Sequence, residues 1–233
     1  MMHYTDFTPH DLVLLVQGLG VSVALFAATA LIGLVIGLAW ATLRYYRVPL
    51  LAPLAALLAE LLKNSPVLVQ LFLVFFGLPV LLELDLTPVE AALITLSGNT
   101  AAFIYVIAVS AIESVGRDQL ETARVFGLSR WQTLHRIVMP QAAAFALGPL
   151  AGLLVNQLQV TSLISVIGVV DLTKVGAILN LRTLKPFIVW TVIGLLYYLM
   201  ARLIAAACAR VETRLRAHRA CCWMKSPARS IPK

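Results

Sequence analysis

Amide and hydroxyl side chains stand inside two long uncharged stretches, where each of them needs a polar partner. They are Asn99 and Thr100 in the first stretch, and Gln159, Thr161 and Ser162 in the second. Polar groups in membrane-spanning helices face the bundle interior or a water-filled path. Amides and hydroxyls can bind a carboxylate and an ammonium group without a fixed charge. We therefore expect this set to contact a small polar solute, and hydrogen bonding between helices is the alternative for any one of them.

Residues that could catalyse a reaction are not grouped in this chain. The four histidines, at positions 3, 10, 135 and 218, are scattered along the sequence, and no paired carboxylates occur within the uncharged stretches. We expect no catalytic residue, no metal site and no cofactor of the chain's own. The 233 residues also lack the G-x-x-x-x-G-K-[ST] pattern of a phosphate-binding loop, so we do not expect this chain to bind ATP.

Long apolar runs must position the polar groups, and they predict an all-α integral membrane protein. Hydrophobic residues make up 61% of the chain and charged residues 12%, against about a quarter charged in soluble domains. Uncharged runs cover residues 12–43, 67–82, 91–112, 141–170 and 187–201. A bilayer core needs roughly 20 apolar residues as helix. With the shorter runs extended past Leu61 and Arg202, we expect five spanning helices.

The basic residues predict how these helices are oriented. With residues 1–11 outside, 15 of the 18 lysines and arginines fall on the cytoplasmic side. The positive-inside rule therefore favours a periplasmic N-terminus and a cytoplasmic C-terminus. We expect one permease domain over 12–219, a cytoplasmic loop over 113–139 and a disordered tail over 220–233. The net charge of +7 indicates contact with membrane lipid rather than nucleic acid.

Three local features of the sequence predict details of these helices. Gly33 and Gly37 share a face and predict close packing with a neighbouring helix. Ser65 could cap a helix that has Pro66 at its first position, or Pro66 could kink one continuous helix. Residues 161–185 are mixed in character and predict a partly re-entrant outer segment.

The cytoplasmic loop carries a helix–glycine–helix pattern, ETARVFGLSRWQTLHRIVMP over residues 121–140. Gly127 can take the positive φ that ends a helix. Ser129 can cap the next one. Pro140 is expected to stop or kink the chain where it re-enters the bilayer. A rigid protrusion of this kind at the membrane surface can serve as a binding site for a soluble partner protein.

This loop resembles the Glu-Ala-Ala…Gly loop of bacterial ATP-binding-cassette (ABC) importer permeases. Glu121, Ala123, Gly127, Ile137 and Pro140 occupy the places of that pattern. Two positions depart from it, with Thr122 for one alanine and Met139 for leucine. The stretches 60–72, 127–133, 161–169 and 182–187 are similar to the polar amino-acid branch, the histidine/glutamine-type permeases. The resemblance covers roughly residues 10–215.

The resemblance implies a type I importer subunit in the bacterial inner membrane. Such permeases pair, as homodimers or heterodimers, and sit on two ATPase subunits that use ATP and Mg²⁺. A periplasmic solute-binding protein delivers the amino acid. The loop then docks on the ATPase as a coupling helix, through a set that would comprise Glu121, Ala123, Gly127, Ser129, Arg130, Trp131, Ile137 and Pro140.

Two departures from the family pattern concern the path. Many members carry an acidic and a basic residue where this chain has Val106 and Val109, and Lys-Asp where it has Gln159-Val160. Either the solute is less charged, or this subunit is the non-binding half of a heterodimer. An ion-coupled secondary transporter and a membrane assembly protein are the alternative functions. The first would need an ionisable relay within the membrane, and helices one, three and four have no acidic residue in their uncharged runs.

Overall fold

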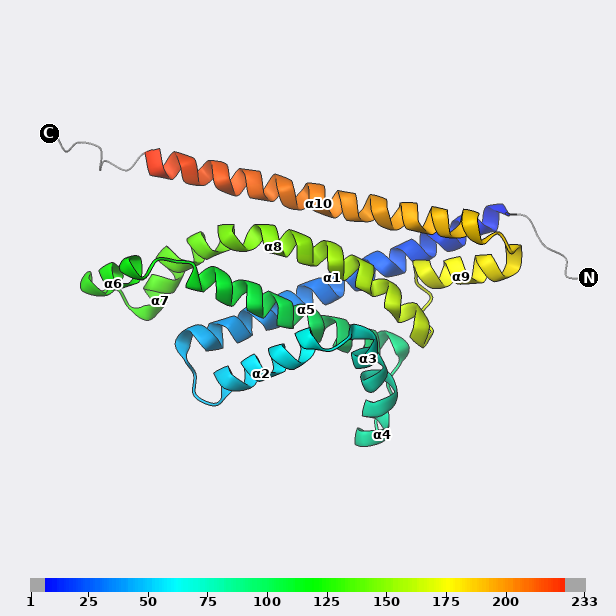
Figure 1. Cartoon of the computed structure of the whole chain (residues 1–233), viewed down its shortest axis with the longest axis horizontal. Coiled ribbons are helices and arrows are strands. Elements are labelled where there is room, and N and C mark those ends of the chain that lie inside the picture. The colour runs from blue at the N-terminus through cyan, green and yellow to red at the C-terminus, as the bar shows by residue number, and fades with distance from the viewer. Residues whose placement is uncertain (1–6, 225–233) are drawn as a thin grey trace, which may run out of the picture.

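Long helices that run along one axis make up most of the protein (Figure 1). The computed structural model describes residues 7–224, with the side chains of 117 and 214–224 left undescribed. In order, the elements are α1 (Pro9–Tyr46), α2 (Leu51–Asn64), α3 (Val67–Phe72), the π-helical turn η1 (Leu73–Gly77), α4 (Leu78–Leu82), α5 (Pro88–Glu113), α6 (Arg117–Val125), α7 (Arg130–Thr133), the π-helical turn η2 (Leu134–Val138), α8 (Met139–Val160), the 3₁₀ helix η3 (Thr161–Ile167), α9 (Leu172–Thr183) and α10 (Pro186–Met224). Four helical stretches are long and apolar enough to cross a membrane, and a bent pair makes a fifth candidate.

The helices begin and end mainly at two opposite ends of the molecule (Figure 1). The connection between α1 and α2, the short helices α6 and α7, and the last turns of α10 lie at one end of the molecule. The start of α1 and helix α9 lie at the other end. Five crossings with the chain ends on opposite sides therefore fit the arrangement of helices, in agreement with the count predicted from the uncharged runs.

Helices α1 and α5 pack closely because glycine removes the side chains between them. A Cβ at Gly33 would lie 2.6 Å from the Cβ of Thr100, and one at Gly37 would lie 2.6 Å from the carbonyl oxygen of Ala101. Any larger residue would push the backbones apart. The predicted packing role of this glycine pair is confirmed.

The second pass is broken, and neither expectation for Ser65 and Pro66 was right. The segments Leu51–Asn64 and Val67–Leu82 meet at 110°, which is too sharp for one kinked helix. Pro66 is itself the N-cap of α3. The Ser65 hydroxyl instead donates to the Leu61 carbonyl at 2.8 Å, which ties it back to α2. Serine can satisfy a backbone carbonyl in this way instead of capping the helix that follows.

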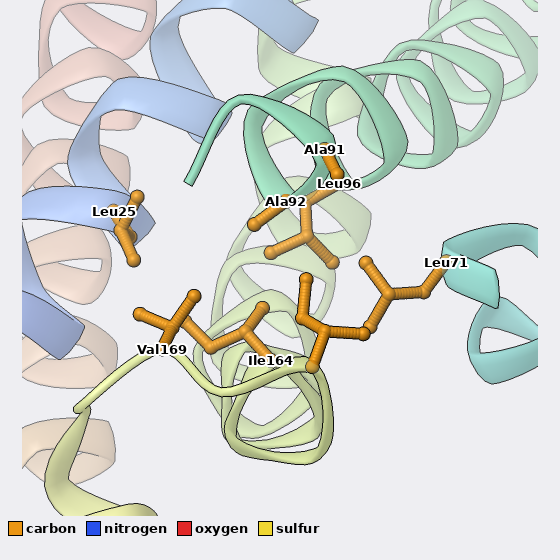
Figure 2. Close-up of a cluster of buried hydrophobic side chains, with 8 residues drawn as sticks. Leu25, Leu71, Ala91, Ala92, Leu96, Ile164 and Val169 are labelled. Atoms are coloured by element: carbon orange, nitrogen blue, oxygen red, sulfur yellow. The ribbon is translucent and has the colours of Figure 1, made fainter. Parts of the chain in front are cut away.

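A cluster of buried side chains holds the broken pass against the rest of the bundle. Figure 2 shows Leu71 of α3, Leu96 of α5, Ile164 of η3 and Leu25 of α1 in this cluster. Leu71, Leu96 and Ile164 have no exposed surface. Helix α5 is set at its start by a capping box, in which the Thr87 amide donates to the Glu90 carboxylate at 2.8 Å. The cluster fixes η3, which carries Thr161 and Ser162, beside α5.

The fourth pass begins before Pro140, so this proline does not stop the helix, which was one of the two expectations for it. The helical stretch runs from Arg130 to Ile167. A proline lacks the amide that would donate four residues back, and its ring crowds that carbonyl. The π-helical turn η2 precedes it, and the Met139 amide donates to the Leu134 carbonyl five residues back. This wider turn accommodates the proline within a continuous helix.

The outer segment 161–185 folds as η3 followed by α9, and α9 is fastened to α1. The Ser22 hydroxyl accepts from the Leu172 amide at 3.1 Å, and the buried Asp11 carboxylate forms an ion pair with Arg182. Helix α10 continues to Met224, so residues 220–224 of the expected tail are helical. Residues 225–233, which complete that tail, lie outside the described part of the chain, as do residues 1–6.

Candidate functional site

Helix α6 ends at Gly127 by backbone geometry that glycine makes possible. The φ of Gly127 is +72°. In that conformation the Gly127 amide donates to the Arg124 carbonyl at 2.9 Å, and the Leu128 amide donates to the Ala123 carbonyl at 3.0 Å. These two bonds satisfy carbonyls that the end of a helix would otherwise leave free. The predicted positive φ of this glycine is confirmed.

Helix α7 begins at Ser129, as the sequence predicts. The Gln132 amide donates to the Ser129 hydroxyl at 3.2 Å, and the Ser129 amide donates to the Gln132 side chain at 2.9 Å. This reciprocal pair is a capping box. Because both flanking helices are capped, residues 126–129 are held as a tight corner between α6 and α7.

Buried side chains attach this corner to the membrane-spanning helices. Ala123 is 2% exposed and Val138 is fully buried, while Ile137 is half-buried. Leu134 and Val138 pack with Val115 at the end of α5. A hydrogen bond of 2.5 Å joins the side chains of Gln119 in α6 and Gln141 in α8. These contacts connect α6 and η2 to α5 and α8.

The outer surface of the corner is apolar although it lies beyond the ends of the long helices. Val125 is 86% exposed, Phe126 79% and Trp131 58%. Trp131 also stacks on His135, with ring centroids 3.9 Å apart. Glu121 and Arg130 are exposed beside them. Exposed apolar residues rimmed by charges are typical of a surface that another protein covers.

The predicted solute-contact residues do not form one group. Asn99, Thr100 and Thr161 are buried, and each has a partner within the chain. The Asn99 amide donates to the Leu62 carbonyl at 3.2 Å. The Thr100 hydroxyl donates to the Leu96 carbonyl at 2.7 Å, and the Thr161 hydroxyl donates to the Leu158 carbonyl at 2.6 Å. Gln159 is exposed and Ser162 half-buried, so these two remain open to a ligand or to a second subunit.

A polar contact between three helices was not foreseen as a unit. The buried Gln157 side chain of α8 donates to the Thr29 hydroxyl of α1 at 3.2 Å and to the Leu96 carbonyl of α5 at 3.5 Å. Gln157 was visible in the sequence as a polar residue in an apolar run. Its partner Thr29 lies 128 residues away, and no spacing rule connects the two.

A second buried polar group lies where α9 starts. The Asp171 carboxylate caps α9 by accepting from the Lys174 amide at 2.8 Å, and it accepts from the Tyr197 hydroxyl at 3.3 Å. Burial raises the pKa of the Asp171 carboxyl above its usual range, although the hydrogen bonds from Lys174, Thr173 and Tyr197 act in the opposite direction. The cluster fixes α9 against α1 and α10.

Comparison with known proteins identifies the family. The family described as "binding-protein-dependent transport system inner membrane component" matches residues 33–216, which include the α6–α7 corner. The chain belongs to this family. It is therefore a permease subunit of an ABC importer, and the comparisons give no support to a secondary transporter or an assembly protein.

Related permeases share about a third of their residues with this one. A probable amino-acid ABC transporter permease of Bacillus subtilis, YckA, is 34% identical over 82% of this chain and 84% of its own length. The L-cystine permease TcyL of the same organism is 32% identical over 84% and 83% of the two chains. The glutamine permease GlnP of Escherichia coli is 29% identical over 79% and 84%.

Solved structures share the fold of this permease. An amino acid ABC transporter crystallised with histidines matches with a TM-score of 0.80 at 24% identity, over 90% of this chain and 100% of that one. The methionine transporter MetNI in an inward-facing conformation matches with a TM-score of 0.78 at 18% identity, over 90% and 99%. At these identities the likeness concerns the fold, which is that of ABC importer permeases.

Proposed function

We propose that this permease forms, with a second permease subunit, the path by which an amino acid crosses the bacterial inner membrane. The three relatives named above are an amino-acid, an L-cystine and a glutamine permease. An amino acid is therefore the class of solute that their likeness supports. The chain is a transport subunit, and its 233 residues contain no phosphate-binding loop pattern. The ATP and Mg²⁺ that drive import are accordingly bound by separate ATPase subunits.

The α6–α7 corner is the surface through which the ATPase acts. One observation carries this assignment: a doubly capped corner exposes Phe126 and Trp131, and the buried Leu134 and Val138 that follow it pack against the spanning helices. A rigid contact of this kind transmits displacement, whereas a flexible loop would absorb it. When two ATPase subunits close on ATP, the corner of each permease carries the movement into the membrane. A periplasmic binding protein supplies the solute at the opposite end.

The solute path follows the polar residues that the chain leaves open. Gln159 and Ser162 are the candidates for contact with solute, because their surfaces are not covered within the chain. Asn99, Thr100 and Thr161 support the path from behind by holding α5 and η3 in position. The absence of charge at Val106 and Val109 fits a path that carries a solute with little net charge.

The test is purification of the tagged full-length permease from its native membranes. We expect two copies of an ATPase to copurify, and ATP-dependent uptake of amino acids after reconstitution with the binding protein. Phe126→Ala should reduce the amount of bound ATPase. Phe187→Ala is the matched control, because Phe187 is 85% exposed and lies at the start of α10, away from the corner.

Three results would contradict the proposal. Uptake driven by an ion gradient without ATP would remove the ATPase from the mechanism. Equal ATPase binding in the two phenylalanine variants would remove the corner from the interface. Import of a solute other than an amino acid would overturn the substrate class while leaving the permease family unchanged.

A further inference from the structure

A cavity of about 1000 Å³ lies between the connection from α1 to α2 and the inner side of the α6–α7 corner. Its floor is apolar and includes Ala41, Val109, Ile112 and Val115. Ala41 and Val115 are buried at 2% and 4% exposure, so the floor belongs to the packed bundle. The volume is at the upper end of the range for small-ligand sites. The walls come from helix ends at one end of the molecule (Figure 1).

Four arginines line this cavity: Arg44, Arg47, Arg124 and Arg130. One acid, Glu113, lines it with them. None of the four guanidinium groups forms an ion pair with any residue in the described part of the chain. Like charges that share a cavity repel one another. The arginines therefore favour an anion between them, and the fork geometry of arginine suits a phosphate group.

The turn that presents Arg44 and Arg47 is held in an unfavourable backbone conformation. Arg47 has a φ of +54° and Leu50 a φ of +66°. The Leu51 amide donates to the Pro49 carbonyl at 2.8 Å, which makes Leu50 the centre of a γ-turn of the rare, strained kind. Non-glycine residues in such conformations are strained and persist where the surroundings impose them, often at binding sites.

We propose that this cavity binds the phosphate headgroup of an anionic phospholipid from the adjacent leaflet. The arginines meet the phosphate, and the apolar floor accepts the glycerol end of the molecule. Leu50 is 80% exposed and Leu54 48% exposed beside the cavity, and they offer acyl chains an apolar surface. Basic pockets between spanning helices at the cytoplasmic surface bind lipid headgroups in this way. Which of the two leaflets supplies the lipid depends on the proposed orientation, whereas the binding site does not.

The lipid would connect two parts of the permease that otherwise share this open space. Arg44 and Arg47 belong to the end of α1, while Arg124 and Arg130 belong to the α6–α7 corner. A single phosphate held by both pairs braces the corner against α1. Anionic lipid is then a structural component of the coupling region, and zwitterionic lipid cannot replace it.

The experiment uses native mass spectrometry of the purified complex in detergent, titrated with phosphatidylglycerol or phosphatidylcholine. We expect the complex to retain phosphatidylglycerol preferentially. The double variant Arg44→Gln/Arg47→Gln should weaken that binding by about tenfold or more, because it removes two of the four guanidinium groups that line the cavity and would contact the phosphate. Arg202→Gln/Arg210→Gln is the matched control, because it removes the same charge from α10 outside the cavity and should leave binding unchanged.

A second measurement needs no variant. A photoactivatable phosphatidylglycerol should crosslink to peptides spanning 41–53 and 109–130 in preference to the outer surface of α10. Equal retention of both lipids, or equal phosphatidylglycerol binding by the double variant and the wild-type complex, would overturn the site. Displacement of the lipid by inorganic phosphate would assign the cavity to a soluble anion. Loss of ATPase from the double variant with lipid binding intact would assign the arginines to ATPase docking.

Discussion

Gly127 and Ser129 show how far single residues can be interpreted before a structure is known. Both predictions rest on local backbone chemistry, the φ of one residue and the capping bond of the other, and both are confirmed. Local rules succeed here because every atom involved lies within a few residues along the chain. The Asp171–Tyr197 contact could not be predicted in this way, because its partners are 26 residues apart and belong to different helices.

The first prediction tests whether Gly127 is needed for its backbone conformation or because a side chain would not fit. A Cβ at this position would meet nothing within 4 Å, so a side chain fits but the φ of +72° disfavours it. Gly127→Val should abolish uptake and weaken ATPase attachment, at a cost of roughly 1–2 kcal/mol in the corner. Gly127→Asn should retain most activity because asparagine tolerates this conformation. Uptake assays at matched expression check both, and equal activity of the two variants would refute the argument.

The second prediction concerns Asp171, whose carboxyl pKa is raised by burial. A raised pKa in the folded state favours the protonated acid, so its contribution to stability is present at low pH and lost as the pH rises through the folded pKa. Asp171→Asn keeps the cap and removes the buried charge. It should therefore raise the thermal unfolding midpoint at neutral pH, with the gain shrinking as the pH falls through the raised folded pKa and absent below about 4.

Asp171→Ala is the comparison for that variant, because it removes both the charge and the cap. Loss of a helix cap costs about 1 kcal/mol. We expect this variant to unfold at a lower temperature than Asp171→Asn at neutral pH. A midpoint for Asp171→Asn below that of the wild type at neutral pH would show that the ionised carboxylate stabilises the fold.

At the scale of elements, helices predicted from uncharged runs are found close to their expected positions. The run over 12–43 lies within α1, and the run over 91–112 lies within α5. The exclusion of charge from a bilayer core acts on many residues at once and so leaves a strong signal. The sequence signal at residues 65–66, where the structure has a 110° break, is ambiguous. A proline after a serine is compatible with a cap, a kink or a break, and the choice is made by the hydrophobic cluster around Leu71.

The third prediction tests the solute path by cysteine accessibility. In a background lacking Cys208, Cys221 and Cys222, Gln159→Cys and Ser162→Cys should react readily with water-soluble thiol reagents. Asn99→Cys and Thr161→Cys should react slowly in the state described here, because both positions are buried. Trapping the ATPase with nucleotide should change the rates at 159 and 162.

Two outcomes would decide against this assignment. Inert cysteines at 159 and 162 in every state would place these residues against lipid or protein instead of water. Rapid reaction at 99 and 161 would instead support a shared aqueous cavity that opens in another conformation. The sequence predicts solute contact for both residues, because polar groups in apolar runs need water or a partner. Partners within the chain account for both in this structure.

At the scale of the whole molecule, most basic residues lie at one of the two ends at which the helices begin and end. The end formed by the α1–α2 connection, α6, α7 and the last turns of α10 carries most of the basic residues. The opposite end carries α9 and the start of α1. The predicted orientation depends on a sum over many residues, and it stays a prediction. The arginine-lined cavity could not be predicted from the sequence, because it depends on how three separate segments meet.

The fourth prediction is the orientation itself. A reporter fused after Arg216 should be cytoplasmic, and one inserted between Leu84 and Thr87 should be periplasmic. The positive-inside distribution of lysine and arginine is the physical reason. Alkaline phosphatase and fluorescent-protein fusions measure the two sides independently. Both reporters on the same side of the membrane would exclude a five-pass arrangement.

The number of residues in the π-helical turn over Leu134–Val138 affects the direction in which α7 is held relative to α8. A π turn holds one residue more than an α-helical turn, so losing a single residue there would restore a regular helix. It would also remove the wider turn that accommodates Pro140, so the proline ring would crowd the carbonyl four residues back and redirect α7, with Trp131, relative to α8. The connection between α4 and α5 can gain or lose a residue without such an effect. A one-codon deletion at 134–138 is therefore a reading-frame-preserving change that should silence the permease while leaving every spanning helix in place.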